Sequence, residues 1–186
     1  MNRTLIATVA DCPGVLTRVA SLFRRRAYNI ESLTVGHTEK EGVSRMTIVV
    51  DSLKTDAAKV AQNLEKLIDV IHVEDITDRP AILHDLVLVK VQIQDRVARS
   101  EILRIADSFQ ARLVDMCPQT AIVEIAGSEQ KIRTVVEALR AHGILEMVRT
   151  GRVAMVRGVD EGEAEATPST GMRMSEWREG GSQWHE

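Results

Sequence analysis

The sequence predicts an α+β fold: two tandem ferredoxin-like sandwiches, each with the order β-α-β-β-α-β, and a disordered C-terminal tail. Two observations lead to this prediction. Strand-like and helix-like apolar periodicities alternate in the same order twice along the 186 residues. The last stretch of the chain then loses this pattern and becomes polar and rich in Gly and Ser.

In the first half, stretches rich in β-forming residues surround two helical apolar stripes. Apolar residues recur at helical spacing over 15–23 and again over 57–71, and Thr55 or Asp56 is the expected N-cap of the second helix. Strands are expected at 4–10, 29–37, 45–51 and 72–77, with a polar hairpin loop at 39–42.

The same order then starts again after a break. Asp78, Arg79 and Pro80 indicate a linker at about 78–84. Strands are expected at 86–94, 112–117, 120–126, 144–150 and 153–156, with helices around 102–109 and after Ser128. The segment 16–23 matches 102–109 position by position, which indicates an internal duplication.

Domain boundaries follow from this pattern: a first domain at 1–78, a second at 84–157, and a tail at 158–186. Each domain is small for its own core, so we expect each to bury more surface against a neighbour. Trp177 and Trp184 in the tail could serve as anchors on another surface, but two aromatic residues in an untethered terminus are the simpler interpretation.

Composition excludes several classes of protein. The net charge of -3 gives no strong attraction to nucleic acid or to an anionic membrane. Cys12 and Cys117 form neither a CxxC pair nor a disulfide framework, which favours a reducing cytoplasm. We expect no signal peptide, because the first apolar stretch stops at Asp11, and no run of about 18 apolar residues predicts a membrane span.

Motifs for catalysis are missing from the sequence. The glycines never take GxGxxG or GxxxxGK spacing, and neither HExxH nor GxSxG occurs. The five histidines are scattered, and we interpret them as surface or strand-end residues rather than metal ligands. We therefore expect a non-catalytic chain that holds no metal and no cofactor.

The turn Asp11-Cys12-Pro13-Gly14, between the first strand and the first helix, is the most informative local feature. A helix N-terminus offers free N–H groups and attracts a carboxylate. Gly14 permits close approach, and Asp11 can accept a hydrogen bond from an ammonium group. The turn thus suits a free amino acid. Alternatively, Asp11 is only an N-cap and Pro-Gly only a turn, which from the turn alone is the simpler interpretation.

Two further features have plain interpretations. Asn29, at the start of the second strand, could add a donor and an acceptor near a ligand, although taken alone it is more often a turn residue. Arg24, Arg25 and Arg26 lie at the expected C-terminal end of the first helix, where cations favour the dipole, so they do not indicate nucleic acid.

The run from Arg26 to Gly36, RAYNIESLTVG, resembles the signature of the small regulatory subunits of acetohydroxyacid synthase, also called acetolactate synthase. Ser44–Ile48, Leu88–Val91 and Val148–Gly151 support the resemblance, which covers about residues 3–157. In that family the N-terminal half is an ACT domain. The Tyr-Asn-Ile-Glu-Ser-Leu stretch is specific within ACT domains, whereas a bare Pro-Gly turn is not.

The resemblance implies that two N-terminal domains pair edge to edge and bind a feedback amino acid, usually valine, at the seam. The residues carried over to matching positions of this sequence are Asp11, Gly14, Val15, Leu16, Asn29, Ile30 and Val35. The first four would hold the amino and carboxyl ends. Asn29 and Ile30 would act across the interface, with Val35 along the neighbouring strand.

The resemblance also implies a partner. The small subunit would activate a catalytic large subunit, which alone carries thiamine diphosphate, magnesium and FAD. It would confer feedback inhibition by valine, leucine or isoleucine in branched-chain amino acid biosynthesis, without nucleic acid or membrane. The alternative is an autonomous ACT-type amino acid sensor acting on a different partner. A small enzyme on this scaffold is the remaining option, and no nucleophile–base or metal pattern supports it.

Two departures affect the site. Position 11 is commonly Asn in the family and is Asp here, which still attracts ammonium but repels a ligand carboxylate and cannot donate. The second half has Asp95-Arg96-Val97-Ala98 where the first has its Pro-Gly turn. Without that glycine we expect no second amino acid site and a role in partner contact instead.

Overall fold

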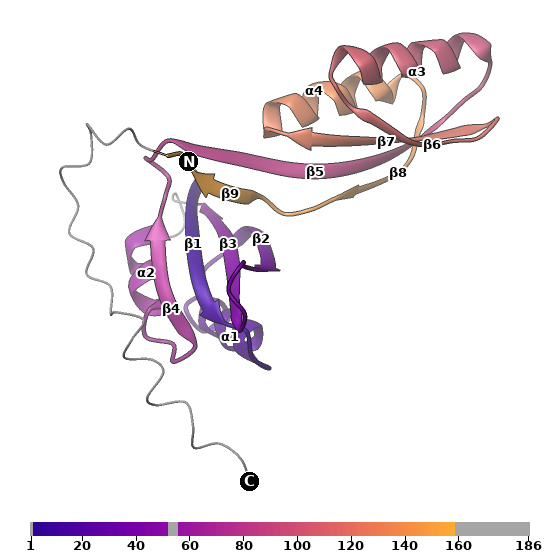
Figure 1. The fold of residues 1–186 in the computed structure, drawn as a ribbon. Coiled ribbons are helices and arrows are strands. Elements are labelled where there is room, and N and C mark those ends of the chain that lie inside the picture. Colours follow the sequence, from indigo (N-terminus) through magenta and orange to yellow (C-terminus); the bar gives the residue numbers. More distant parts are fainter. Residues whose placement is uncertain (1, 52–55, 159–186) are drawn as a thin grey trace.

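The computed structural model describes residues 2–51 and 56–158 and places them in two successive βαββαβ units (Figure 1). The first unit comprises β1 (Asn2–Ala10), α1 (Val15–Arg25), β2 (Ile30–His37), β3 (Val43–Asp51), α2 (Ala57–Leu64) and β4 (Val70–Asp75). The second comprises β5 (Ala81–Gln92), α3 (Arg96–Ser108), β6 (Arg112–Met116), β7 (Thr120–Gly127), α4 (Glu129–Arg140) and β8 (Ile144–Arg149), and β9 (Val153–Val156) follows. The predicted fold class is confirmed. The predicted tail, with Trp177 and Trp184, lies from residue 159 onward outside the described residues.

Both units have the same sheet topology. The first sheet has the order β2-β3-β1-β4 and the second β6-β7-β5-β8, with antiparallel neighbours throughout. β2 is therefore an edge strand of the first sheet, as β6 is of the second. β9 pairs with the first four residues of β5, 81–84, so the long strand β5 joins the two units. Figure 1 shows β5 and β9 running side by side beyond the first sheet.

Each unit has its own core between sheet and helices, and alternation along the strands explains it. On β1, Leu5, Ala7 and Val9 are fully buried and face the helices, where Val19 of α1 and Val60 of α2 pack against them. The second core is built in the same way from β5, β7, α3 and α4, and its fully buried residues are Val87, Val89, Val91, Ile102, Ala121, Val123, Ile125, Val135 and Leu139.

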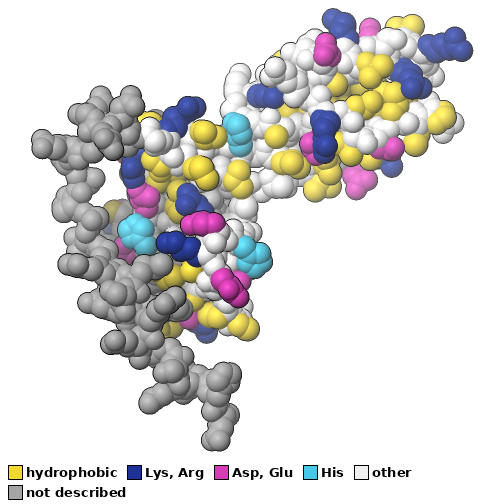
Figure 2. Space-filling view, viewed as in Figure 1, with side chains coloured by type: hydrophobic (Ala, Val, Ile, Leu, Met, Phe, Trp, Pro, Cys, Tyr) yellow, Lys and Arg dark blue, Asp and Glu magenta, His cyan; other side chains and the backbone are white. Residues whose placement is uncertain are grey.

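The two units also share a small apolar contact. Ile6 and Ile76 of the first unit pack with Ala154 of β9, and Leu83 of β5 lies against them. This contact covers part of the helix-free face of the first sheet. It supplies some of the extra burial that small units need. Elsewhere, Figure 2 shows charged side chains of both signs interspersed with exposed hydrophobic ones.

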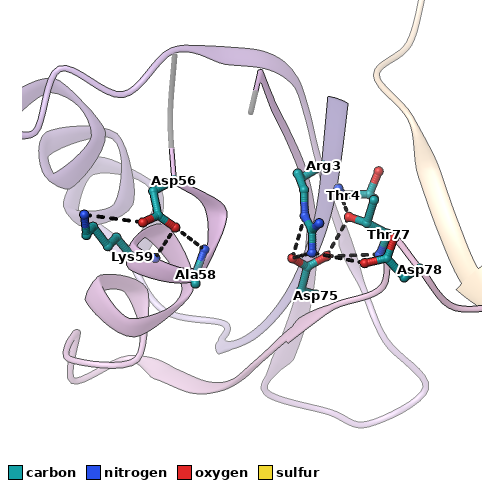
Figure 3. Close-up of polar contacts among 8 residues, drawn as sticks. All are labelled: Arg3, Thr4, Asp56, Ala58, Lys59, Asp75, Thr77 and Asp78. Atoms are coloured by element: carbon teal, nitrogen blue, oxygen red, sulfur yellow. Dashed lines mark hydrogen bonds and ion pairs between the residues drawn. The ribbon is translucent and has the colours of Figure 1, made fainter. Parts of the chain in front are cut away.

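Hydrogen bonds and ion pairs of two aspartates fix the ends of elements in the first unit (Figure 3). The Asp56 carboxylate accepts hydrogen bonds from Ala58 N (3.1 Å) and Lys59 N (3.4 Å), which confirms Asp56 as the N-cap of α2. Asp75 accepts from Thr77 and from Arg3 Nη2 at 2.8 Å. Burial raises the pKa of Asp75, but the hydrogen bonds from Thr77 and Arg3 outweigh burial and leave the pKa below its usual value.

Several boundaries differ from the sequence prediction by a few residues, and two of the differences have a clear physical reason. The apolar stripe over 57–71 is helical only as far as Leu64, after which Leu67 N donates to Leu64 O and Val70 N to Leu67 O. These consecutive turns keep apolar residues three apart, so periodicity alone cannot reveal where the helix ends. The linker predicted at 78–84 is also shorter, because β5 already begins at Ala81 and pairs there with β9.

The internal repeat is present, but its predicted register is wrong. α1 and α3 are each followed by a non-glycine residue with positive φ, Ala27 and Gln110, which lie 83 positions apart. The matched segments 16–23 and 102–109 lie 86 positions apart. The structural register pairs Val19 with Ile102, both fully buried, and leaves Leu16 exposed. A slip of three residues is nearly one helical turn, so the apolar stripe still matches.

Among the described residues, no helix is long and apolar enough to cross a membrane.

Candidate functional site

The turn between β1 and α1 opens the first helix without a side-chain cap from any described residue. Gly14 is the N-cap and has φ +88°, a left-handed conformation that favours glycine. The interpretation of Asp11 as an N-cap is therefore wrong. Its backbone N–H donates instead to Gly42 O at 2.8 Å, which ties the turn to the β2–β3 hairpin. Cys12 is partly buried and packs against the first core.

Arg18 brings a positive charge over this turn. A Cβ placed on Gly14 would lie 3.5 Å from Arg18 Nη1. Arg18 Nε forms an ion pair with Asp69, whose side chain is largely buried, and this hydrogen bond raises the pKa of Arg18 above its usual value. The guanidinium is thus held in place beside the helix N-terminus, where the dipole also favours an anion.

The turn also carries a carboxylate, that of Asp11. The Asp11 side chain is 42% exposed, and its Oδ2 is 3.1 Å from Nδ1 of His37. His37 is the last residue of β2 and is highly exposed, which fits the strand-end interpretation made for the histidines. The pair connects the turn to the C-terminal end of the edge strand.

The remaining predicted residues lie in the first helical turn and along β2. Val15 is buried in the first core, whereas Leu16 and Val35 are 44% and 42% exposed. Val35 pairs with Met46, so its side chain is on the helix-covered face of the sheet. Asn29 is exposed and donates to Glu31 Oε1 at 2.5 Å, and Ile30 is half-buried against the core.

Within one chain the structure brings only part of the predicted site together. Asp11 lies at the His37 end of β2, and Asn29 precedes the other end. Eight residues of strand separate these ends, roughly 25 Å at the rise of a β-strand. Asn29 and Ile30 therefore cannot reach a ligand at Gly14 of their own chain.

Sequence reasoning missed two groups of residues. The first is Arg18, whose position four residues after Gly14 could have placed it over the turn. The second group is a contact between β2 and the segment that follows β8, where Arg152 N donates to Ser32 Oγ at 2.9 Å. Nothing in the local sequence indicates that residues 120 positions apart meet there.

The described residues offer no arrangement of three or more His, Cys, Asp or Glu side chains that could hold a metal ion. One histidine departs from the surface or strand-end interpretation: His142, after α4, is buried, with Nε2 3.8 Å from Glu101 Oε2.

Comparisons with known proteins identify the family of the chain. Residues 5–72 match the model of the ACT domain found in acetohydroxyacid synthase small subunits, and residues 84–158 match the model of the small subunit of acetolactate synthase. A probable acetolactate synthase small subunit of Archaeoglobus fulgidus is 44% identical over 158 residues, which is 85% of this chain and 98% of the relative. That of Bacillus subtilis is 41% identical over 162 residues, covering 87% and 94%.

A solved structure is similar over the same region. The acetolactate synthase small subunit of Thermotoga maritima superposes with a TM-score of 0.78 at 30% identity, covering 86% of this chain and 99% of the other. Sequence, domain models and fold therefore agree along nearly all of the described residues, and the chain belongs to the family of acetolactate synthase small subunits, with an ACT domain in its first half.

Proposed function

We propose that this chain gives a separate acetolactate synthase catalytic subunit its response to branched-chain amino acids, by binding valine or a relative between two copies of the first unit. The observation that carries the proposal is the open N-terminus of α1 at Gly14, close to the Arg18 guanidinium, which is paired with Asp69, and near the exposed Asp11 carboxylate, which contacts the end of an edge strand. The domain at 1–78 would bind the effector and dimerise. The domain at 84–157 would contact the catalytic subunit, on which the cofactors are expected.

The charges around the turn suit a zwitterion. The effector carboxylate would take the free N–H groups of the first turn, close to the Arg18 guanidinium. The ammonium group would face Asp11, whose carboxylate is exposed and partnered by the surface residue His37. Leu16 and Val35 expose apolar surface, which suits a branched aliphatic side chain.

A second copy of the chain would bring Asn29 close to the turn at Gly14, although the two lie far apart within one chain. An edge strand has unpaired backbone groups that can add a strand from another chain. If two β2 strands pair antiparallel, the Asn29 end of one lies beside the His37 end of the other. Asn29 and Ile30 would then complete the site that Asp11 and Gly14 begin, and the seam would contain two equivalent sites.

Valine titration by calorimetry tests the site directly, comparing wild type with Gly14→Asp. The substitution adds a carboxylate where the effector carboxylate would lie, so we expect binding to be lost. Gly143→Asp is the matched control, because Gly143 also has positive φ, +78°, but lies in the second unit. Equal binding by wild type and Gly14→Asp would remove the proposed site.

A second experiment tests the regulatory role itself. The activity of the matching catalytic subunit is measured with and without this chain, across series of valine, leucine and isoleucine. We expect activation by the chain and its reversal by at least one of the three. Effector binding without any effect on activity would favour an amino acid sensor that serves a different partner.

A further inference from the structure

The segment after β8 lies against the edge strand of the first unit. A Cβ on Gly151 would lie 2.7 Å from Leu33 O and 2.9 Å from Ser32 Oγ, and it would also collide with Thr34 Oγ1. Contact with a backbone carbonyl cannot be relieved by turning a side chain. Only glycine fits at this position while β2 stays where it is.

Arg152, in the same segment, contacts both units. Its backbone N–H donates to Ser32 Oγ at 2.9 Å on β2. Its side chain is largely buried: Nη2 lies 2.7 Å from Glu129 Oε2 at the start of α4, and Nε lies 3.8 Å from Asp85 Oδ1 on β5. The chain thus touches the edge strand with its backbone and the second unit with its guanidinium.

A buried carboxylate strengthens these contacts. Asp85 is 5% exposed, and its Oδ2 also accepts hydrogen bonds from Arg149, the last residue of β8. Arg149 is therefore hydrogen-bonded to this buried side chain, whereas Arg152 Nε approaches Asp85 Oδ1 at 3.8 Å without forming a hydrogen bond. Charge-assisted hydrogen bonds from Arg149 to Asp85 and from Arg152 to Glu129 thus tie the segment 149–152 to β5 and α4.

A pocket that is partly open to solvent lies beside this contact. Its volume is about 470 Å³, and both units line it, with Asn2, Ser32 and Val49 on one side and Asp85, Glu129 and Arg152 on the other. Beside this pocket, the contacts of Gly151 and Arg152 with residues 32–34 tie β2 to the second unit.

The two faces of β2 have different neighbours. Leu33 and Val35 pair with buried core residues of β3 and so share the helix-covered face. Ser32 and Thr34 are on the opposite face, where Gly151 and Arg152 lie. The proposed effector contacts and the contacts to the second unit thus lie on the same short strand.

We infer that Gly151 and Arg152 are positioning residues for β2. They couple the position of β2, which carries the proposed effector contacts, to the position of the second unit. This inference rests on the proposed function, since it takes β2 to carry effector contacts. Effector binding at the seam shifts or stiffens β2, the segment 149–152 follows, and β5 and α4 change their position relative to the first unit. Differential contact of this kind is what coupling between two sites requires.

Two variants test the coupling, and one serves as control. Gly151→Ala adds a methyl group against β2. Ser32→Ala removes the acceptor of the Arg152 N–H and adds no atoms. Gly158→Ala is the control, because a Cβ there meets nothing within 4 Å. Each full chain is combined with the catalytic subunit, and valine binding and inhibition are both measured.

The deciding quantity is the extent of inhibition at saturating valine, which a simple loss of affinity does not change. We expect Gly151→Ala and Ser32→Ala to bind valine and to activate the partner, while the coupling ratio between valine and activity falls about three- to thirty-fold. Gly158→Ala should behave as wild type.

Other outcomes overturn the inference. The inference is refuted if both variants are inhibited at saturating valine as strongly as wild type. It is also refuted if both variants bind valine more weakly but are still fully inhibited at saturation. If Gly151→Ala does not fold, Ser32→Ala decides alone. A wild-type chain that neither binds valine nor responds to it would instead refute the proposed function, so the two failures are distinguishable.

Discussion

The two units repeat one topology but begin their first helices differently. α1 starts at left-handed Gly14, and no described side chain caps it. α3 starts after Asp95, whose carboxylate accepts a hydrogen bond from Ala98 N at 2.7 Å. A helix that caps itself has one fewer free N–H to offer, and its cap carboxylate repels another anion. The first unit therefore offers an anion an open helix N-terminus, whereas the corresponding helix of the second unit is capped by its own carboxylate.

The edge strands differ in the same sense. β2 has eight residues, whereas its counterpart β6 has five and carries the Arg112–Glu124 ion pair to β7. Both strands expose a valine, Val35 on β2 and Val114 on β6, so the difference lies in length and charge. A longer edge offers more backbone groups to a second copy. The first unit combines the open helix and the long edge, and the second has neither.

The largest expected effect tests the pairing of Leu16 with Ile102, which the sequence match favours. Ile102→Ala should lower the free energy of unfolding by about 2–5 kcal/mol, because it leaves a cavity in the second core. Leu16→Ala should change it by less than about 0.5 kcal/mol, because Leu16 is exposed. Urea unfolding of both variants measures the difference.

Val19→Ala completes that comparison, because the structure pairs Val19 rather than Leu16 with Ile102. We expect a clear loss of stability from Val19→Ala. Similar losses from Leu16→Ala and Ile102→Ala would show that the sequence register, and not the structural one, is correct.

A smaller effect sharpens the contrast between the two turns. Asp95→Ala should cost about 1 kcal/mol of stability, since it removes a helix cap. Asp11→Ala should leave stability within about 0.5 kcal/mol of wild type, since Asp11 caps no helix and pairs with exposed His37. The same variant should weaken valine binding in calorimetry. Equal losses of stability from both substitutions would contradict the assignment of the caps.

The smallest effect concerns pH and the ion pair between Arg3 and Asp75 in the first unit. The folded pKa of Asp75 is lowered from 3.8, so its stabilisation is complete above that value and is lost as the pH falls through the folded pKa. Asp75→Asn should therefore lose less stability than wild type between about pH 5 and about pH 3, by up to about 1 kcal/mol for such a half-exposed pair.

Asp78→Asn is the control for the Arg3–Asp75 ion pair. Asp78 also approaches Arg3, at 3.3 Å, but its side chain is 82% exposed. Its acid response should match that of wild type in thermal unfolding at several pH values. An unchanged response of Asp75→Asn would show that this carboxylate does not contribute to acid sensitivity.

Much of the fold could be predicted because the decisive signals are local. Alternating residues on β1 and the helical stripe of α1 specify their own buried faces, and Asp56 and Ser128 cap their helices as expected. The end of α2 and the register of the repeat could not be predicted, because tight turns and a slip of one helical turn preserve the same apolar spacing.

The candidate site divides in the same way. The turn at 11–14 is visible in the sequence because proline and glycine restrict or free the backbone locally. Arg18 over the turn, the Asp11–His37 pair and the Gly151 contact join residues that are distant in the chain or on different elements.

The sequence by itself determined the order of the elements, the two cores and the place of the turn, since periodicity and backbone preference act over a few residues. Only the tertiary structure decided which helix N-terminus stays open, how far Asn29 lies from Gly14, and which strand the segment after β8 touches. Those outcomes depend on how strands from distant parts of the chain pair and how their faces pack, and no local pattern encodes that choice.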